Sequence, residues 1–316
     1  MRIVVLHDPS FDEAQLARLR GVGMLTVHDD TVGEAQAIQR LEGAQIAVVD
    51  SFKVPVTRPV IERCAGLRLL VLTSTAFHLV DFAAAKARGV KVANIPGYST
   101  EAVAEHAIAL MLAVARAIPF ADQAMRVRPF QIDPAVEAHR QFLGFELRGK
   151  TLGVIGLGAI GRRVAELGLS LGMRVVAYNR SPRRMAHVRI MALDELLAMS
   201  DVVSIHLAVH RDTENIISDR ELSLMRPGAV LINTAGGELV DTAALYRALE
   251  ERKIVGAGLD VLAPWESANP LLGLSNVVLT PQSAAWTREA GATLTESIVD
   301  TIEAFARGRP VNIVNP

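Results

Sequence analysis

The chain has 316 residues, which is enough for two domains, because a single hydrophobic core rarely grows beyond roughly 250 residues. Its 33 basic and 34 acidic side chains give a formal net charge of -1, which argues against nucleic acid or an anionic membrane as a partner. The lone cysteine, Cys64, excludes an internal disulfide, and the first residues resemble a strand instead of an export signal. We therefore expect a cytoplasmic protein with a small-molecule partner, no transmembrane segment and no metal site.

Short β-rich runs alternate with helix-length amphipathic segments in the first third of the chain. Alternation of this kind is typical of parallel strands joined by helices. Strands are predicted at Arg2 to Leu6, Ile46 to Val49, Leu69 to Leu72 and Val90 to Ala93, and helices at Phe11 to Leu19 and Glu34 to Leu41.

One long, mostly buried helix is predicted from Glu101 to Ile118, with Ser99 or Thr100 as its N-cap and Pro119 as its end. The stretch from Arg126 to Arg148 is richer in charge, proline and glutamine than its neighbours. We expect this stretch to pack on something outside its own domain, and a dimer partner would suit it.

A second series of strands begins at Thr151. It runs through TLGVIG, MRVVAYN, VVSIHL, AVLINT, IVGAGLDV and NVVLTP, with helix-length segments between most of them. The second half of the chain therefore predicts another doubly wound parallel sheet.

The segment GLGAIG places Gly156, Gly158 and Gly161 between the strand TLGVI and the helix RRVAELGLSLG. The first glycine permits a tight turn, the second lets the backbone approach a pyrophosphate, and the third lets helix and strand pack closely. The alternative is a tight turn that binds nothing. The following strand, MRVVAYN, also falls where a mononucleotide-binding unit needs it, which favours a dinucleotide site.

The residues that end this second strand bear on cofactor choice, because an acidic side chain there binds the ribose 2′-hydroxyl and repels a 2′-phosphate. The chain has Asn179, Arg180 and Ser181 instead, with Arg183 and Arg184 close behind. A guanidinium suits a phosphate, so NADP(H) is expected in preference to NAD(H). The alternative is that these arginines form a solvated loop.

Several ordered blocks resemble the D-isomer-specific 2-hydroxyacid dehydrogenase family, among them ELRGKTLGVIGLGAIGRRVAELGLSLGMRVVAYNRSP, MRPGAVLINTAGGELVDTAAL and NPLLGLSNVVLTP. The resemblance covers nearly the whole chain. It implies an α/β fold of two doubly wound, Rossmann-like parallel-sheet domains and usually a homodimer. The NAD(P)-binding domain, 100–287, would be inserted into a flavodoxin-like substrate domain made of 1–99 and 288–316.

The resemblance also implies which residues contact the cofactor, at the strand ends and in the turns after them. Asp260 falls at the nicotinamide side. The full set is Gly156, Gly158, Ala159, Ile160, Gly161, Asn179, Arg180, Ser181, His206, Leu207, Ala208, Thr213, Thr234, Ala235, Gly236 and Asp260.

The three catalytic residues of the family are replaced. Members of the family use a His to move the proton, a Glu to tune that His, and an Arg to hold the substrate carboxylate or carbonyl. The Arg position in NTAGGELVD is Gly236, the Glu position after LDV is Trp265, and the His position in TPQSAAW is Gln282. Gln282 can donate and accept hydrogen bonds but cannot titrate.

Two other residues, as a pair from opposite sides of the cleft, are candidates for moving a proton in place of the missing histidine. His78 lies in a first-domain loop that borders the substrate in the family, and the alternative is that it is a histidine of a surface turn. Glu266 is the nearest carboxylate to the expected Glu position. The substrate-lining residues implied by the resemblance are Thr75, Ala76, Phe77, Tyr98, Trp265 and Trp286, although each tryptophan could instead belong to a core.

Three functions remain open on these residues. The first is an NAD(P)-dependent oxidoreductase that transfers hydride to or from a non-standard carbonyl or imine, with feeble activity on glyoxylate, hydroxypyruvate and pyruvate. The second is a catalytically silent dinucleotide-binding sensor or regulatory protein. The third is a cofactor-assisted lyase or isomerase. The retained cofactor residues favour the first, whereas loss of the proton-handling groups favours the second.

Overall fold

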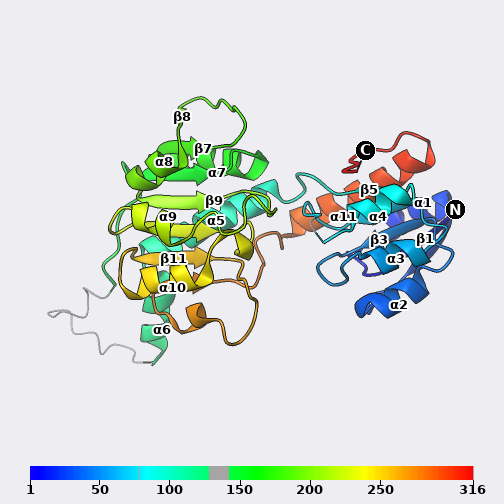
Figure 1. Ribbon diagram of the computed structural model, residues 1–316, viewed down its shortest axis with the longest axis horizontal. Coiled ribbons are helices and arrows are strands. Elements are labelled where there is room, and N and C mark those ends of the chain that lie inside the picture. The colour runs from blue at the N-terminus through cyan, green and yellow to red at the C-terminus, as the bar shows by residue number, and fades with distance from the viewer. Residues whose placement is uncertain (78, 128–141, 316) are drawn as a thin grey trace. The chain divides into compact units, whose positions relative to one another are not determined.

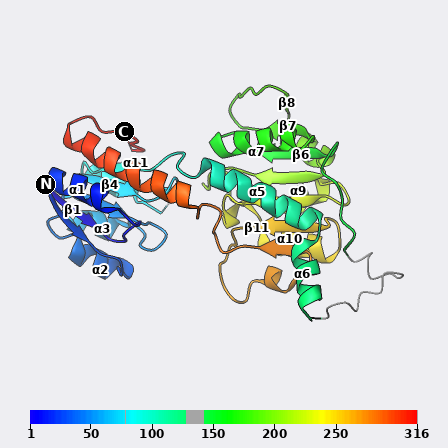
Figure 2. The ribbon, with the colours of Figure 1, turned by 180° about the vertical axis from the view of Figure 1, so that it is seen from behind.

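The computed structural model describes residues 1–77, 79–127 and 142–315, which form two compact units (Figure 1, Figure 2). The first unit comprises Met1–Ser99 and Trp286–Pro316, and the second comprises Thr100–Ala285. Each unit is built around one wholly parallel sheet with helices on both faces. The predicted fold class is confirmed.

The first unit has a five-stranded sheet in the order β2-β1-β3-β4-β5, which is the flavodoxin-like order. Side chains of β1, β3 and β4 alternate between two apolar layers, one under α2, α3 and α4 and the other under α1 and α11. The strands are β1 (Arg2–Val5), β2 (Met24–Val27), β3 (Ile46–Val49), β4 (Leu69–Leu72) and β5 (Lys91–Ala93), and the helices are α1 (Glu13–Val22), α2 (Gly33–Arg40), α3 (Arg58–Arg63), α4 (Phe82–Ala87) and α11 (Arg288–Ala306).

The second unit has a seven-stranded sheet in the order β12-β11-β10-β9-β6-β7-β8, whose direction of winding reverses between β6 and β9. Helices α5 and α7 cover one face, and α8, α9 and α10 cover the other. The strands are β6 (Thr151–Ile155), β7 (Arg174–Tyr178), β8 (Val188–Ile190), β9 (Val202–Ile205), β10 (Val230–Asn233), β11 (Gly256–Leu259) and β12 (Val277–Leu279), and the helices are α5 (Thr100–Ala115), α6 (Ile118–Val127), α7 (Ala159–Ser170), α8 (Leu193–Met199), α9 (Asp219–Leu224) and α10 (Thr242–Glu250), with 3-10 turns at Gly237–Leu239 and Pro270–Gly273.

The predicted single helix from Glu101 to Ile118 is wrong at its end. Helix α5 stops at Ala115, Ala117 takes the left-handed backbone conformation with φ of 51°, and α6 begins at Ile118. Pro119 lies in the first turn of α6, where its missing N–H would have no helical partner in any case. Most of the predicted dimer-facing stretch, 128–141, lies outside the described residues.

None of the helices that the structure describes is by itself long and apolar enough to cross a membrane. Among the described helices, only α5 and α6 taken together meet the length and composition of a span, and the chain bends by 58° between them. Seven residues of α5 are buried in its own unit, Ala102, Val103, Ala104, Ala107, Leu110, Met111 and Ala115.

Candidate active site

The glycine turn joins the carboxyl end of β6 to the N-terminus of α7. Gly156 has φ of +97°, and a Cβ atom there would lie 2.4 Å from the carbonyl oxygen of His206. A Cβ atom on Gly161 would lie 1.9 Å from the carbonyl oxygen of Gly156, so only glycine allows α7 to approach this closely. Gly158 caps α7, and a Cβ atom there would meet no heavy atom within 4 Å outside the adjoining backbone, which leaves room for a ligand at the N-terminus of a 12-residue helix. These features fit a pyrophosphate.

The end of β7 lies beside this turn. The Asn179 side chain accepts a hydrogen bond from the Leu157 N–H at 2.9 Å and donates one to the Ser181 carbonyl at 2.7 Å, so it braces the glycine turn. Arg180 is exposed and forms one ion pair, with Asp212 at 3.4 Å. Arg183 and Arg184 form no ion pair with any residue in the described part of the chain. Cationic residues therefore follow the end of β7, where a ribose 2′-substituent would be recognised.

The end of β9 lies across the winding reversal from β6. His206 Nε2 lies 2.8 Å from Ser204 Oγ, and burial lowers the pKa of His206 to about 3, so its ring is neutral at physiological pH. The Thr213 hydroxyl donates to the carbonyl of Ala208 at 2.8 Å and fixes the following loop. Leu207 lies beside the glycine turn, near the position that a Cβ on Gly156 would take.

The turn after β10 carries the residue that replaces the family's arginine. Oδ1 of Asn233 accepts the N–H groups of Ala235 and Gly236, and Nδ2 of Asn233 donates to the Gly236 carbonyl at 2.8 Å. These hydrogen bonds hold the turn together internally. Because position 236 is a glycine, the turn carries no cationic side chain there. The buried hydroxyl of Thr234 has no hydrogen-bond partner in the structure, which leaves one polar group at this strand end for a ligand to satisfy.

The carboxylate of Asp260, which is 2% exposed, organises the turn after β12. It accepts hydrogen bonds from the Thr280 hydroxyl at 2.6 Å and from the N–H groups of Ser283 and Ala284 at 2.9 and 3.0 Å. His106 Nε2, from α5, lies 2.9 Å from Thr280 Oγ1 and 3.5 Å from the Asp260 carboxylate. Because the single Thr280 proton goes to the carboxylate, the Nε2 of His106 is assigned as the donor to Thr280.

Gln282, which replaces the family's histidine, projects from this turn. Its backbone N–H donates to the Asp260 carbonyl at 2.9 Å, and its φ of 55° is left-handed, a conformation that Asn, Asp and His adopt more readily than other side chains. The Gln282 side chain is exposed and forms no hydrogen bond with a described residue. It is therefore free to bind a ligand. Thr280, which the sequence analysis did not single out, fixes this geometry through Asp260.

A cavity of about 410 Å³ lies next to Thr280. Trp265 and Glu266 line it, and Trp265 is 56% exposed, so this tryptophan is not a core residue. Glu266 forms no ion pair with any residue that the structure describes, and no contact joins it to His106 or Asp260.

The remaining predicted residues lie in the first unit. Thr75, Ala76 and Phe77 follow β4, and Tyr98 follows the neighbouring strand β5, so all four lie near the carboxyl edge of that sheet. Burial raises the pKa of the Tyr98 hydroxyl above its ordinary value. Trp286, which is 74% exposed, precedes α11. His78 lies outside the described residues.

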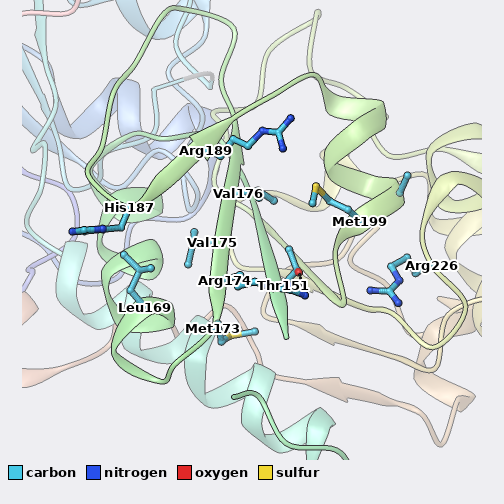
Figure 3. Close-up of a pocket in the computed structure, with 11 residues that line it drawn as sticks. Thr151, Leu169, Met173, Arg174, Val175, Val176, His187, Arg189, Met199 and Arg226 are labelled. Carbon is cyan, nitrogen blue, oxygen red and sulfur yellow. Dashed lines mark hydrogen bonds between the residues drawn. The ribbon is translucent and has the colours of Figure 1, made fainter. Parts of the chain in front are cut away.

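A larger cavity, about 660 Å³, lies elsewhere in the second unit (Figure 3). Its lining includes Thr151 and Arg174, which begin β6 and β7, whereas the glycine turn follows the opposite end of β6. This cavity is therefore not the cofactor site. Across the described ranges, no group of three or more His, Cys, Asp or Glu side chains is placed to hold a metal ion.

Comparison with known proteins decides the family. The sequence pattern of the D-isomer specific 2-hydroxyacid dehydrogenase, NAD binding domain, matches residues 108–284. The chain is 37% identical over 297 residues to a glycerate dehydrogenase of Methylorubrum extorquens, covering 91% of this chain and 90% of the relative. The chain belongs to the D-isomer-specific 2-hydroxyacid dehydrogenase family. A hydroxypyruvate reductase of Blautia hydrogenotrophica shares 33% identity with this family member over 100% of both chains.

Among solved structures, an acyclic imino acid reductase in complex with NADPH and D-Arg is similar to this dehydrogenase-family chain. The TM-score is 0.92 with 37% sequence identity, covering 99% of this chain and 100% of that one. The resemblance predicted from the sequence is confirmed, and the protein is an NAD(P)-dependent oxidoreductase of the 2-hydroxyacid dehydrogenase family, acting on CH–OH or related groups. It uses a nicotinamide dinucleotide as cofactor.

Proposed function

We propose that this member of the family reduces the C=N bond of imines formed from 2-oxo acids, with NADPH preferred over NADH. The observation that carries the proposal is the replacement of the family's arginine, glutamate and histidine by Gly236, Trp265 and Gln282. The similar acyclic imino acid reductase, with its NADPH complex, supports it.

The physical reason lies in the proton requirement of the two reductions. Hydride addition to a carbonyl leaves an alkoxide, which needs a proton from a nearby acid, and a cation must polarise the carbonyl beforehand. A protonated imine already carries both the proton and the charge. NADPH held with its pyrophosphate at Gly156, Gly158 and Gly161 would supply a hydride, whose electron pair would form the new C–H bond while the C=N π pair moved to nitrogen, giving a neutral amine and NADP⁺. No enzyme acid is needed in this step.

The residues present at the site fit a reaction that needs no proton donor from the enzyme. Gln282 can orient a substrate by hydrogen bonds but cannot supply a proton. His106 does not replace the missing histidine, because its Nε2–H is directed to Thr280. Asp260 keeps the turn in place with all of its acceptor bonds made within the second unit. We keep Glu266 and His78 as candidate proton donors for any carbonyl reaction.

The preference for NADPH rests on the charges after β7. Asn179 binds the Leu157 N–H of the glycine turn through Oδ1 and the Ser181 carbonyl through Nδ2, so the residue that ends β7 is an amide and not a carboxylate. Arg180 has one exposed acidic partner, and exposed ion pairs of this kind are weak, so its guanidinium can be recruited by a 2′-phosphate.

The alternatives have less support. The relatives carry the names of dehydrogenases and reductases, which does not favour a silent sensor or a cofactor-assisted lyase or isomerase. The homodimer and the cytoplasmic location stay predictions.

Calorimetric titration of the purified protein with NADPH and with NADH, followed by a screen of carbonyl and imine substrates, tests the proposal. We expect tighter binding of NADPH and turnover of imines. Binding without turnover of any substrate would support the sensor, and failure to bind either cofactor would overturn the proposal.

A further inference from the structure

The cavity beside Thr280 has an unusual combination of lining groups. Its volume is about 410 Å³, and it is formed by the loop after β11, the 3-10 turn that follows, and the end of β12. Most of its side chains are apolar and one is charged. The lining residues are Leu262, Trp265, Glu266, Ser267, Leu272, Leu279, Thr280 and Pro281.

Glu266 is the charged member, and nothing in the described part of the chain neutralises it. No Lys, Arg or His lines the cavity. The exposed, unpaired carboxylate of Glu266 can pair with a cation, and the exposed Trp265 ring offers a face on which the cation can stack. The leucines fit the aliphatic stem of a long side chain that carries its charge at the tip.

The cavity is formed by a fixed loop. The buried Asn269 donates from Nδ2 to the Pro264 carbonyl at 2.9 Å and from its backbone N–H to the Glu266 carbonyl at 3.1 Å. The Thr242 hydroxyl, at the start of α10, donates to the carbonyl of Ala263. Hydrogen bonds therefore hold both ends of the Glu266 segment. Little conformational freedom of the loop is lost when a ligand binds.

The cavity also adjoins the candidate active site within the same unit. Thr280 both lines it and donates to Asp260, and Gln282 follows two residues later. We infer that this cavity is the subsite for the substrate's side chain, and that it takes a cationic aliphatic side chain ending in a guanidinium or an ammonium group. The inference rests on the proposed function, because it places an imino acid at Gln282.

The test compares imines that methylamine forms with three 2-oxo acids. These are 2-oxo-5-guanidinopentanoate, which is cationic, 2-oxohexanoate, which is neutral, and 2-oxoglutarate, which is anionic. For the wild type we expect kcat/KM to fall in that order. Glu266→Gln should lower the ratio of cationic to neutral kcat/KM by about tenfold, through KM, and Glu266→Lys should shift the preference to 2-oxoglutarate.

Glu195→Gln is the matched control, because Glu195 is an exposed carboxylate on α8 that does not line the cavity. It should leave the substrate ratio unchanged. An unchanged ratio in both Glu266 variants would overturn the inference. So would an equal loss of kcat for all three substrates with loss of one limb of the pH profile, since that result would make Glu266 a proton donor.

If the wild type reduces no imine, the proposed function fails, and the subsite is still tested by binding. Titration of the NADPH-loaded protein with D-arginine and with D-norleucine should show tighter binding of D-arginine, and Glu266→Gln should remove the difference. Equal binding of both ligands to the wild type would overturn the subsite.

Discussion

A Cβ atom on Gly236 would lie 2.3 Å from Cγ2 of Val209, so the position where the family carries arginine is blocked by a neighbouring side chain. The φ of Gly236 is -170°, an extended conformation that any residue can adopt, so the obstacle is the valine and not the backbone. Two segments therefore disfavour an arginine here. The turn after β10 has a glycine at position 236, and Val209 in the loop after β9 occupies the space of its side chain.

Restoring the family's arginine and histidine accordingly requires three changes. Gly236→Arg alone should destabilise the protein by about 1–3 kcal/mol through overlap with Val209. Combined with Val209→Ala and Gln282→His, it should raise kcat/KM for glyoxylate at least about tenfold over the wild type. The double variant without the arginine is the control, and denaturant unfolding checks stability. No gain in the triple variant would mean that the site has diverged beyond these positions.

Alanine substitutions at two glycines of the turn should have different effects, one on folding stability and the other on NADPH affinity. Gly161→Ala places Cβ 1.9 Å from a backbone oxygen and should cost more than about 3 kcal/mol of folding free energy. The Cβ atom of Gly158→Ala would meet no heavy atom within 4 Å outside the adjoining backbone, so the protein should fold normally, yet bind NADPH about tenfold more weakly because the methyl group occupies ligand space. Unfolding curves and calorimetry separate the two effects. Wild-type NADPH affinity in Gly158→Ala would contradict the placement of the pyrophosphate.

Arg180 should decide between the two cofactors. Arg180→Ala removes a guanidinium that can pair with a 2′-phosphate and should weaken NADPH binding by about tenfold while leaving NADH binding nearly unchanged. Asp212→Asn removes its exposed partner and serves as the control, with NADPH binding equal to or slightly tighter than that of the wild type. Equal weakening of both cofactors in Arg180→Ala would assign the residue a structural role.

His206 predicts how stability changes with pH. Burial lowers its pKa from 6.5 to about 3 in the folded protein. Between these two pH values the His206 imidazole is protonated in the unfolded chain and neutral in the folded chain. The free energy of unfolding therefore falls as the pH falls, by at most about 1.4 kcal/mol per pH unit. His206→Gln should flatten this dependence in denaturant titrations from pH 7 to pH 4. His187→Gln, an exposed histidine, is the control. Parallel curves for His206→Gln and the wild type would disprove the assignment.

The fold followed from the sequence where local patterns determine structure. Buried parallel strands give continuous apolar runs, and β3 and β4 lie where these runs predicted them. Strands β2 and β8 were missed because their residues are only partly buried or exposed, so they form no continuous apolar run. The end of α5 was misplaced because a left-handed Ala117 leaves no trace in an apolar pattern.

The candidate site was predictable only in part for the same reason. Glycine spacing and the replaced residues are local signals. The contact of Val209 with the Gly236 position, the proton arrangement through Thr280, and the isolated charge of Glu266 depend on residues brought together by the sheet, so no single segment reveals them.

The most direct test of the account is the rate of NADPH oxidation with pyruvate, glyoxylate or hydroxypyruvate, in the absence and presence of methylamine, with the product identified by mass spectrometry. We expect a rate that rises with methylamine, saturates, and exceeds the amine-free rate by at least about tenfold, with the N-methyl amino acid as product. Robust oxidation at the same rate without the amine, with the 2-hydroxy acid as product, would contradict the account.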